Sequence, residues 1–256
     1  MILENNYMVR EVIGPKDCAG LIEQGVKYLQ QAQTFKSSTG EVEDNIRNSE
    51  VAWFTDLDFA NKLAPIVREM NIHAGWNFDI SAVENIQFTK YGPGQYYEWH
   101  PDGGSDWPNI YNPAKKNEQG KWVQGRYEVN AEGTDMKYVA GADGYHPLVN
   151  WTEEPAPVND KFDVPTFGWV ADKAWWGKVR KLSMTINLSQ PDEYEGGNLE
   201  IKYNTKEGTQ ETKVIEEGRK QGTMILFPSF LPHRVSPVKR GTRYSMVIWI
   251  LGKPFK

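Results

Sequence analysis

Sulfur ligands are almost absent from this sequence, because Cys18 is the only cysteine among 256 residues. A single thiol excludes an internal disulfide and any zinc site built from several thiolates, and it is typical of a reducing compartment. Long hydrophobic runs are missing too. No stretch approaches the roughly 18 apolar residues that a membrane span needs, and residues 1–10 lack the apolar core of a secretory signal. The sequence therefore predicts a cytoplasmic protein that does not contact a membrane.

An excess of positive charge is also missing, since 29 Lys and Arg residues stand against 34 Asp and Glu residues and give a net charge of -5. Such a chain offers no basic face for a polyanion, so we predict no nucleic-acid partner. Aromatic residues make up 12% of the chain and include ten Trp, which is typical of an aromatic-lined interior or binding surface. A length of 256 residues predicts one domain over residues 1–256.

Apolar residues with helical spacing predict two amphipathic helices before residue 78. The first follows the Gly-Pro pair at 14–15 and runs to about Gln33. A polar loop is expected over Lys36 to Asn48. The second helix is capped at residue 55 or 56 and ends before Gly75. Both helices are expected to support the fold and to carry no chemistry.

From about Phe78 the apolar period changes to two, which is typical of β-strands with one apolar and one polar face. The clearest alternations cover residues 86–91, 182–188, 198–203, 223–227 and 243–251. Short strands joined by Gly- and Pro-containing turns predict an α+β fold that is mainly β, a sandwich or jelly roll with helices on one side. The repeated polar face is either exposed to water or lines a cavity, and periodicity alone does not decide between these readings.

A long segment over residues 103–176 shows neither helical nor strand period and is rich in Pro, Gly, Asn and aromatic residues. Loops of this length without structure are uncommon within a compact domain. Its aromatic content argues against simple disorder. We interpret it as an insertion built of small hairpins or as a lid.

Histidine is scarce, and any histidine-based site must draw on His73, His100, His146 and His233. In the sequence His100-Pro101-Asp102, extended backbone places an imidazole and a carboxylate on the same side of the chain. His233 follows an apolar strand and a turn that contains proline. Two His and one carboxylate form the triad that leaves metal positions open for oxygen-activating iron(II). The alternative is that His100 and His233 are structural, as we expect of His73 at a helix end and His146 in a loop.

Arg243 opens the last predicted strand, ten residues after His233. Its guanidinium is suited to bidentate binding of a dicarboxylate. With a period of two, Ser245 lies on the same face and can add a hydroxyl donor, and Trp249 lies there too. Ser183 belongs to the polar face of another strand that can line the same cavity, together with Thr185 and Asn187.

Two stretches together resemble the prolyl 4-hydroxylase branch of the 2-oxoglutarate- and iron(II)-dependent oxygenases. They are YGPGQYYEWHPD at residues 91–102 and the segment from Phe227 to Arg243. The resemblance covers residues 77–102 and 179–251 well and does not extend to 103–176. It implies a double-stranded β-helix, the jelly roll of this superfamily, supported by N-terminal helices and interrupted by a long insertion.

Family roles carry over to this chain residue by residue. The resemblance implies that His100, Asp102 and His233 ligate iron and that Arg243 binds the distal carboxylate of 2-oxoglutarate. Tyr91 would hydrogen-bond the cosubstrate. The serines of the polar faces, Ser245 and Ser183, would lie beside the cosubstrate, and Tyr97 and Trp249 would line the substrate pocket. Tyr91, Tyr97 and Trp249 also admit a reading as plain core aromatics.

The implied activity is hydroxylation of a C–H bond with O2, iron(II) and 2-oxoglutarate, which is decarboxylated to succinate and CO2. Ascorbate is a further cofactor consistent with the resemblance. The first expectation is a prolyl 4-hydroxylase acting on a proline-containing peptide or protein. Arg243 stands where collagen-type members usually have Lys, and the 103–176 segment stands where substrate-covering loops begin. The alternatives are a hydroxylase of a free amino acid or other small molecule and a non-catalytic binding protein with the same fold.

Overall fold

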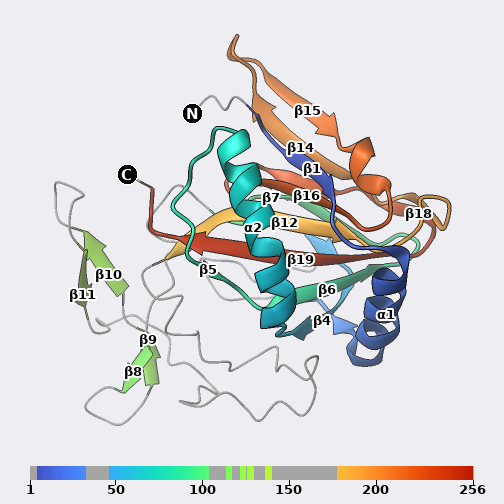
Figure 1. Ribbon diagram of the computed structural model, residues 1–256, viewed down its shortest axis with the longest axis horizontal. Coiled ribbons are helices and arrows are strands. Elements are labelled where there is room, and N and C mark those ends of the chain that lie inside the picture. Colours follow the sequence, from blue (N-terminus) through green and yellow to red (C-terminus); the bar gives the residue numbers. More distant parts are fainter. Residues whose placement is uncertain are drawn as a thin grey trace.

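Two antiparallel sheets face each other in the computed structural model (Figure 1). It describes residues 5–32, 46–103 and 178–255 together with four short strands between residues 114 and 139. The sheets have eight and five strands, and three further two-stranded pairs accompany them. The arrangement is a jelly roll with helices on one side, so the predicted fold class is confirmed.

The larger sheet has the order β1-β16-β12-β19-β6-β4-β2, with β5 paired to β19. Its strands are β1 (Met8–Glu11), β2 (Gln30–Gln31), β4 (Glu50–Phe54), β5 (Ala82–Val83), β6 (Ile86–Tyr91), β12 (Val179–Asn187), β16 (Thr223–Pro228) and β19 (Arg243–Gly252). The predicted strands at residues 86–91, 182–188, 223–227 and 243–251 correspond to β6, β12, β16 and β19.

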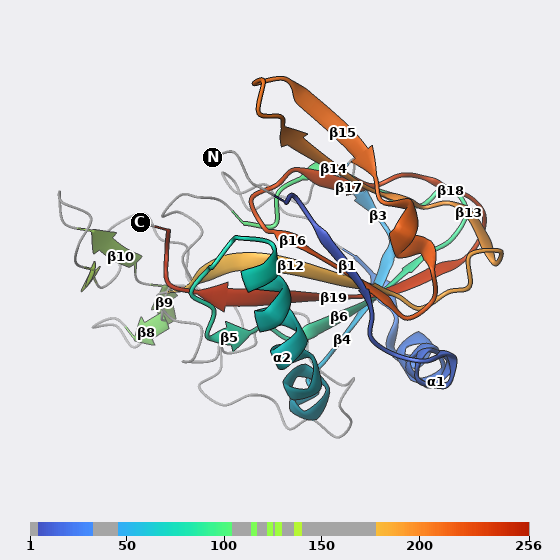
Figure 2. The ribbon, with the colours of Figure 1, turned by 45° about the horizontal axis from the view of Figure 1, so that its top comes forward.

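The smaller sheet has the order β15-β14-β17-β7-β3. Its strands are β3 (Arg47–Asn48), β7 (Tyr96–His100), β14 (Leu199–Asn204), β15 (Gln210–Val214) and β17 (His233–Val235). The β14–β15 hairpin projects beyond the body of this sheet (Figure 2). A separate pair joins β13 (Tyr194–Gly196), which precedes β14 in the chain, to β18 (Val238–Gly241), which follows β17. A 3-10 turn, η4 (Glu216–Arg219), follows β15.

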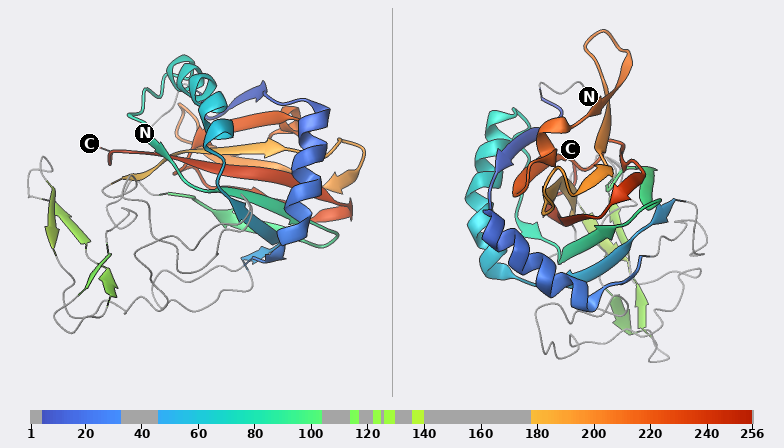
Figure 3. Two further views of the ribbon diagram at one scale, coloured as in Figure 1. Left: turned by 60° about the horizontal axis from the view of Figure 1, so that its bottom comes forward. Right: turned by 90° about the vertical axis from the view of Figure 1, so that its right-hand side faces the viewer.

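Helices α1 (Pro15–Gly25) and α2 (Leu57–His73) lie outside the larger sheet (Figure 3). The α2 prediction is confirmed: the Asp56 carboxylate accepts a hydrogen bond from the Phe59 backbone N–H at 2.9 Å, and the helix ends before Gly75. The two helices pack on the sheet through buried apolar side chains that include Leu21, Leu63 and Val67.

The predicted end of the first helix at about Gln33 is wrong. The helix ends at Gly25, a 3-10 turn η1 (Val26–Tyr28) follows, and Gln30–Gln31 pairs with β4 as β2. At Gly25 the backbone approaches the sheet so closely that a Cβ atom would lie 2.6 Å from the Phe88 ring, which leaves no room for a larger residue. The predicted loop over 36–48 is also wrong at its end, because Arg47–Asn48 forms β3.

Side chains alternate along the strands of the larger sheet between an apolar face and a polar face. Phe88, Ile186 and Met246 point outward into the core beneath the helices and are fully buried. Thr89 and Ser245, which are direct cross-strand partners, point to the opposite face. This polar face lines a cavity between the sheets, which decides between the two readings left open by periodicity.

Between residues 103 and 178 the structure describes two antiparallel pairs, β8 (Ala114–Lys116) with β9 (Trp122–Gln124) and β10 (Arg126–Val129) with β11 (Met136–Val139). The rest of the predicted 103–176 insertion lies outside the described residues, so its role as an insertion or lid stays a prediction. No helix in the described part of the chain is both long and apolar enough to cross a membrane.

Candidate metal and cosubstrate site

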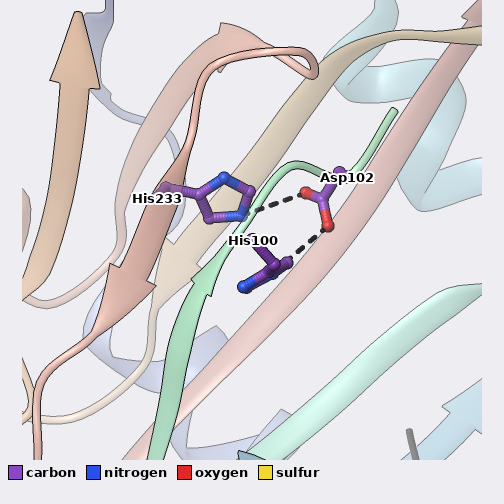
Figure 4. A group of neighbouring side chains, drawn as sticks. All are labelled: His100, Asp102 and His233. Carbon is purple, nitrogen blue, oxygen red and sulfur yellow. Dashed lines mark ion pairs between the residues drawn. The ribbon is translucent and has the colours of Figure 1, made fainter. Parts of the chain in front are cut away.

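The side chains of His100, Asp102 and His233 point toward one another (Figure 4), and all three line the cavity. His100 ends β7 and His233 begins β17, and the two residues are direct partners in the ladder between these strands. The His100 Nε2 lies 3.6 Å from Asp102 Oδ1, and the His233 Nε2 lies 3.3 Å from Asp102 Oδ2. One ligand atom from each residue falls within 4.8 Å of the others, a spacing suited to one metal ion.

Both imidazoles are oriented by main-chain carbonyls. The Nδ1 of His100 lies 2.7 Å from the Glu98 carbonyl oxygen, and the Nδ1 of His233 lies 3.0 Å from the Leu231 carbonyl oxygen. Because a carbonyl only accepts, each Nδ1 must carry the proton and donate, and each neutral ring then offers the Nε2 lone pair toward the cavity. This is how histidine ligands of metal ions are commonly held.

The charges at the site favour an ionised carboxylate. Burial alone would raise the pKa of Asp102, but the adjacent imidazoles of His233 and His100 hold that pKa well below its ordinary value. Burial lowers the pKa of His100 and outweighs its hydrogen bond to Asp102. At His233 burial acts in the same direction, but the attraction of Asp102 raises the pKa overall. The set therefore supplies one negative charge and two imidazoles that are neutral when metal is bound.

Ser183 contacts a residue of this triad. Its hydroxyl donates to Asp102 Oδ2 at 2.7 Å and lies 3.0 Å from the hydroxyl of Ser229. Ser183 was expected beside the cosubstrate, and the structure places it in the cavity wall against the carboxylate. Ser229 could not be identified from a sequence pattern, because it lies in a turn between two prolines.

Arg243 lies on the same wall of the cavity and is 4% exposed. Its Nη1 donates to the hydroxyl of Ser245 at 3.2 Å, and its guanidinium carbon lies 5.8 Å from the centre of the Tyr91 ring, its cross-strand partner. Within the described residues no carboxylate pairs with Arg243. A buried cation without an anion is suited to a carboxylate ligand.

Tyr97 and Trp249 also line this cavity. The Tyr97 ring stacks on His100 with 3.5 Å between ring centres, and burial raises the pKa of Tyr97 to about 12. A shift in strand register between His233 and Val235 lets Tyr97 and His100, three residues apart, face the same side. The Trp249 ring stacks on Trp53, and its buried Nε1–H has no hydrogen-bond partner among the residues that the structure describes.

Two charged residues near the triad, the partly buried Arg180 and the buried Glu84, were not predicted from the sequence. Arg180 makes two hydrogen bonds of 2.6 Å to the carboxylate of Glu84, donates to the Asp102 carbonyl at 3.2 Å, and lies 4.0 Å above the Trp249 ring. Neither residue belongs to a recognisable motif. The irregular pairing between Arg180 and Leu182 interrupts the period that would have placed Arg180.

Of the other two histidines, only His73 lies among the described residues, and it does not contribute to the site. His73 is the last residue of α2, is 65% exposed and lies 3.7 Å from Glu69, as expected of a residue at a helix end. His146 lies outside the described residues.

Comparison with known proteins gives a family and several relatives. Residues 160–251 match the model of the 2OG-Fe(II) oxygenase superfamily. A PKHD-type hydroxylase of Synechococcus sp. (strain JA-2-3B'a(2-13)) is 42% identical over 69 residues, which cover 27% of this chain and 28% of the relative. A PKHD-type hydroxylase of Methylobacterium nodulans is 27% identical over 180 residues, which cover 56% of this chain and 75% of the relative. The matched part of this chain thus spans little more than a quarter of the first relative and three quarters of the second.

A solved structure shares the fold. It is a prolyl hydroxylase from Trichoplax adhaerens in complex with a hypoxia inducible factor oxygen degradation domain peptide fragment. The likeness covers 97% of this chain and 84% of that chain with a TM-score of 0.51 and 13% sequence identity. At this identity the likeness supports the jelly roll alone.

Proposed function

We propose that this chain, which belongs to the 2OG-Fe(II) oxygenase superfamily and resembles its prolyl hydroxylases, is a 2-oxoglutarate- and iron(II)-dependent dioxygenase that hydroxylates a C–H bond. The observation that carries the proposal is the placement of two different sites in one cavity. His100, Asp102 and His233 bring three ligand atoms within 4.8 Å, and the buried guanidinium of Arg243, which no carboxylate among the described residues neutralises, lines the same cavity.

The donor set fits iron(II). Two imidazole nitrogens and one carboxylate match the facial triad of oxygen-activating iron enzymes. The low pKa of Asp102 keeps the carboxylate charged, and the carbonyls of Glu98 and Leu231 hold both rings in the tautomer that a metal requires. His100, Asp102 and His233 would hold the ion. When bound, iron(II) and 2-oxoglutarate reduce O2 so that one oxygen atom enters succinate, the other enters the substrate as a hydroxyl group, and CO2 is released.

The remaining side chains of the cavity bind and orient the cosubstrate. Arg243 would pair with the distal carboxylate of 2-oxoglutarate, and the Ser245 hydroxyl beside it would add a hydrogen bond. Tyr91, the cross-strand partner of Arg243, would donate its phenolic hydrogen to the cosubstrate. Because these groups are buried, the electrostatic attraction is stronger than it would be in water.

For the substrate we propose a prolyl residue of a peptide, hydroxylated at its C4 position. The relatives named PKHD-type hydroxylase and the resemblance of residues 91–102 to prolyl 4-hydroxylases support this class. Tyr97 lines the cavity from the smaller sheet and Trp249 from the larger sheet, and both would contact the prolyl ring with their aromatic faces. The Trp249 Nε1–H, which has no hydrogen-bond partner within the described part of the chain, would then donate to a substrate carbonyl oxygen.

The activity is tested by measuring succinate formation that depends on substrate. His233→Ala removes a buried ligand and is expected to abolish succinate formation, whereas His73→Ala, a change at the exposed end of α2, should retain it. Unchanged turnover in His233→Ala would contradict the proposal. A wild-type protein that binds neither iron(II) nor 2-oxoglutarate in an anaerobic titration would instead indicate a non-catalytic binding protein.

The substrate class needs its own measurement. Proline-rich peptides, the same peptides with alanine in place of proline, and free amino acids are incubated with the complete system and analysed by mass spectrometry. We expect the gain of one oxygen atom only in peptides that contain proline. Product from a free amino acid but from no peptide would identify a small-molecule hydroxylase.

A further inference from the structure

The carboxylate of Asp102 is held by a chain of buried hydroxyl groups. Asp102 Oδ2 lies 2.7 Å from the Ser183 hydroxyl, which lies 3.0 Å from the Ser229 hydroxyl. Ser183 is 1% exposed and Ser229 is fully buried, so water does not compete for these bonds. The three residues come from separate parts of the chain: the turn after β7, the middle of β12 and the turn after β16.

The direction of these hydrogen bonds follows from the number of protons. An ionised carboxylate only accepts, so Ser183 must give its single hydroxyl hydrogen to Asp102. Ser183 then has only lone pairs to offer to Ser229, and Ser229 must be the donor in the second bond. The chain therefore runs in one direction, from Ser229 to Ser183 to Asp102.

Ser229 also holds the main chain of the same turn. Its carbonyl oxygen accepts hydrogen bonds from the backbone N–H groups of Asp102 and Gly103, both at 3.0 Å, and its own N–H donates to the Lys181 carbonyl at 3.0 Å. Backbone and side chain of Asp102 are thus fixed to the same two strands. A carboxylate fixed in this way loses little rotational freedom when it binds an ion.

We infer that Ser183 is a positioning residue that sets the metal affinity of this site, with Ser229 orienting its hydroxyl. The inference rests on the proposed function, because it takes Asp102 as a metal ligand. Ser183 itself would not contact the ion. It acts through the carboxylate, by holding Oδ2 at a fixed angle.

The effect expected for Ser183→Ala is a loss of metal affinity of ~10- to 100-fold, the range for removal of a hydrogen bond to a metal ligand. Ser229→Ala should have a smaller effect, because Ser183 can still donate to Asp102 without it. Ser183→Thr keeps the hydroxyl and should restore most of the affinity. Metal affinity is therefore expected to decrease in the order wild type, Ser183→Thr, Ser229→Ala and Ser183→Ala.

A matched control separates positioning from general destabilisation. Ser189 is also a fully buried serine with two hydrogen bonds, since its hydroxyl donates to the Thr242 carbonyl and accepts from the Tyr244 N–H. Neither bond involves the triad. Ser189→Ala should lower the unfolding temperature of the metal-free protein and leave the metal affinity unchanged.

The probe is Mn(II), which occupies octahedral oxygen and nitrogen sites without being oxidised in air, and the readout is the electron paramagnetic resonance signal of the free ion during titration. Metal-free melting temperatures are measured by circular dichroism for every variant. Weaker binding in Ser183→Ala, restored by Ser183→Thr and absent from Ser189→Ala, supports the inference. Affinity within about twofold of wild type in Ser183→Ala, or equal losses in Ser183→Ala and Ser189→Ala, would overturn it. If the wild-type protein itself does not bind Mn(II), it is the proposed function that fails.

Discussion

Replacement of Arg243 by methionine separates the proposed role in cosubstrate binding from a structural role. The wild-type Arg243 is 4% exposed, and its guanidinium donates a hydrogen bond to Ser245 and lies beside the ring of Tyr91. No carboxylate among the described residues neutralises it. A cation buried in this way lowers the stability of the ligand-free protein unless a ligand supplies the anion.

The size of the effect follows from the burial. Removal of one partner from a buried, hydrogen-bonded charge pair costs about 2–5 kcal/mol of binding free energy. At about 1.4 kcal/mol for each factor of ten, this weakens 2-oxoglutarate binding by about 30- to 4,000-fold. Because Ser245 keeps a hydroxyl donor next to the carboxylate, we expect a value in the lower part of this range. The metal-free and ligand-free protein should unfold at the same temperature as the wild type or a higher one.

Calorimetric titration of the Mn(II)-loaded proteins measures both affinities. Each protein is titrated with 2-oxoglutarate and with 2-oxopentanoate, which has the same carbon skeleton and 2-oxo acid group but no distal carboxylate. Wild type should prefer 2-oxoglutarate strongly, and Arg243→Met should bind the two ligands with similar affinity. The difference between the two preferences isolates the interaction of one guanidinium with one carboxylate.

Two results would refute this reasoning. A wild-type preference for 2-oxoglutarate in Arg243→Met would show that another group binds the distal carboxylate. Alternatively, affinity for both ligands could fall equally while the unfolding temperature drops, which would show that Arg243 stabilises the fold and has no selective contact with the cosubstrate.

Other predictions concern the scaffold. Glu84→Gln should lower the free energy of unfolding, measured in urea, by about 3 kcal/mol, because the fully buried carboxylate pairs with Arg180. This value is at the low end of the range for a buried ion pair, since the Arg180 side chain is 24% exposed. An unchanged unfolding midpoint would contradict the prediction. Burial lowers the pKa of Lys181 to about 8, so between pH 8 and its ordinary pKa the unfolded state binds more protons and stability rises with pH. The gain in unfolding temperature from Lys181→Met should therefore be largest at pH 7 and shrink above pH 8, and a gain independent of pH would exclude this cause. Gly252→Ala should prevent native packing, because the new Cβ would lie 1.7 Å from the Asp79 carbonyl oxygen; a soluble variant with wild-type circular dichroism and melting temperature would argue otherwise.

The sequence was sufficient for the parts of the site that follow a regular period. Arg243, Ser245 and Trp249 alternate along β19, and all three line the cavity. The side chains of His100 and Asp102 can reach the same metal ion, because residues two apart in an extended chain point to the same side. The α2 helix was equally predictable, because Asp56 provides a strong cap before a clear apolar stripe.

Residues placed by irregular backbone could not be predicted in the same way. Ser229 reaches Asp102 from a turn, and Arg180 lies where the strand register shifts, so neither position follows from a period. The end of α1 was missed because the apolar spacing continues past Gly25, whereas the contact that ends the helix is with Phe88, more than sixty residues away in the chain. Contacts between distant segments have no local signature.

The same alternation that builds the core also fixes the chemistry, and this explains how so many polar groups can remain buried at the site. A shift of β12 by one residue would turn Met184 into the cavity and Ser183 into the apolar layer beneath the helices. Met184 and Ile186 pair with Ile248 and Met246 of β19, and all four are at most 2% exposed. Each fully buried side chain of this kind contributes about 1.5–3 kcal/mol. Burial of the outer face therefore holds the strand in register against the cost of desolvating the hydroxyl and guanidinium groups on the inner face. Because none of these outer side chains faces the triad, their substitution should affect metal and cosubstrate binding only indirectly, by changing the position of the strand.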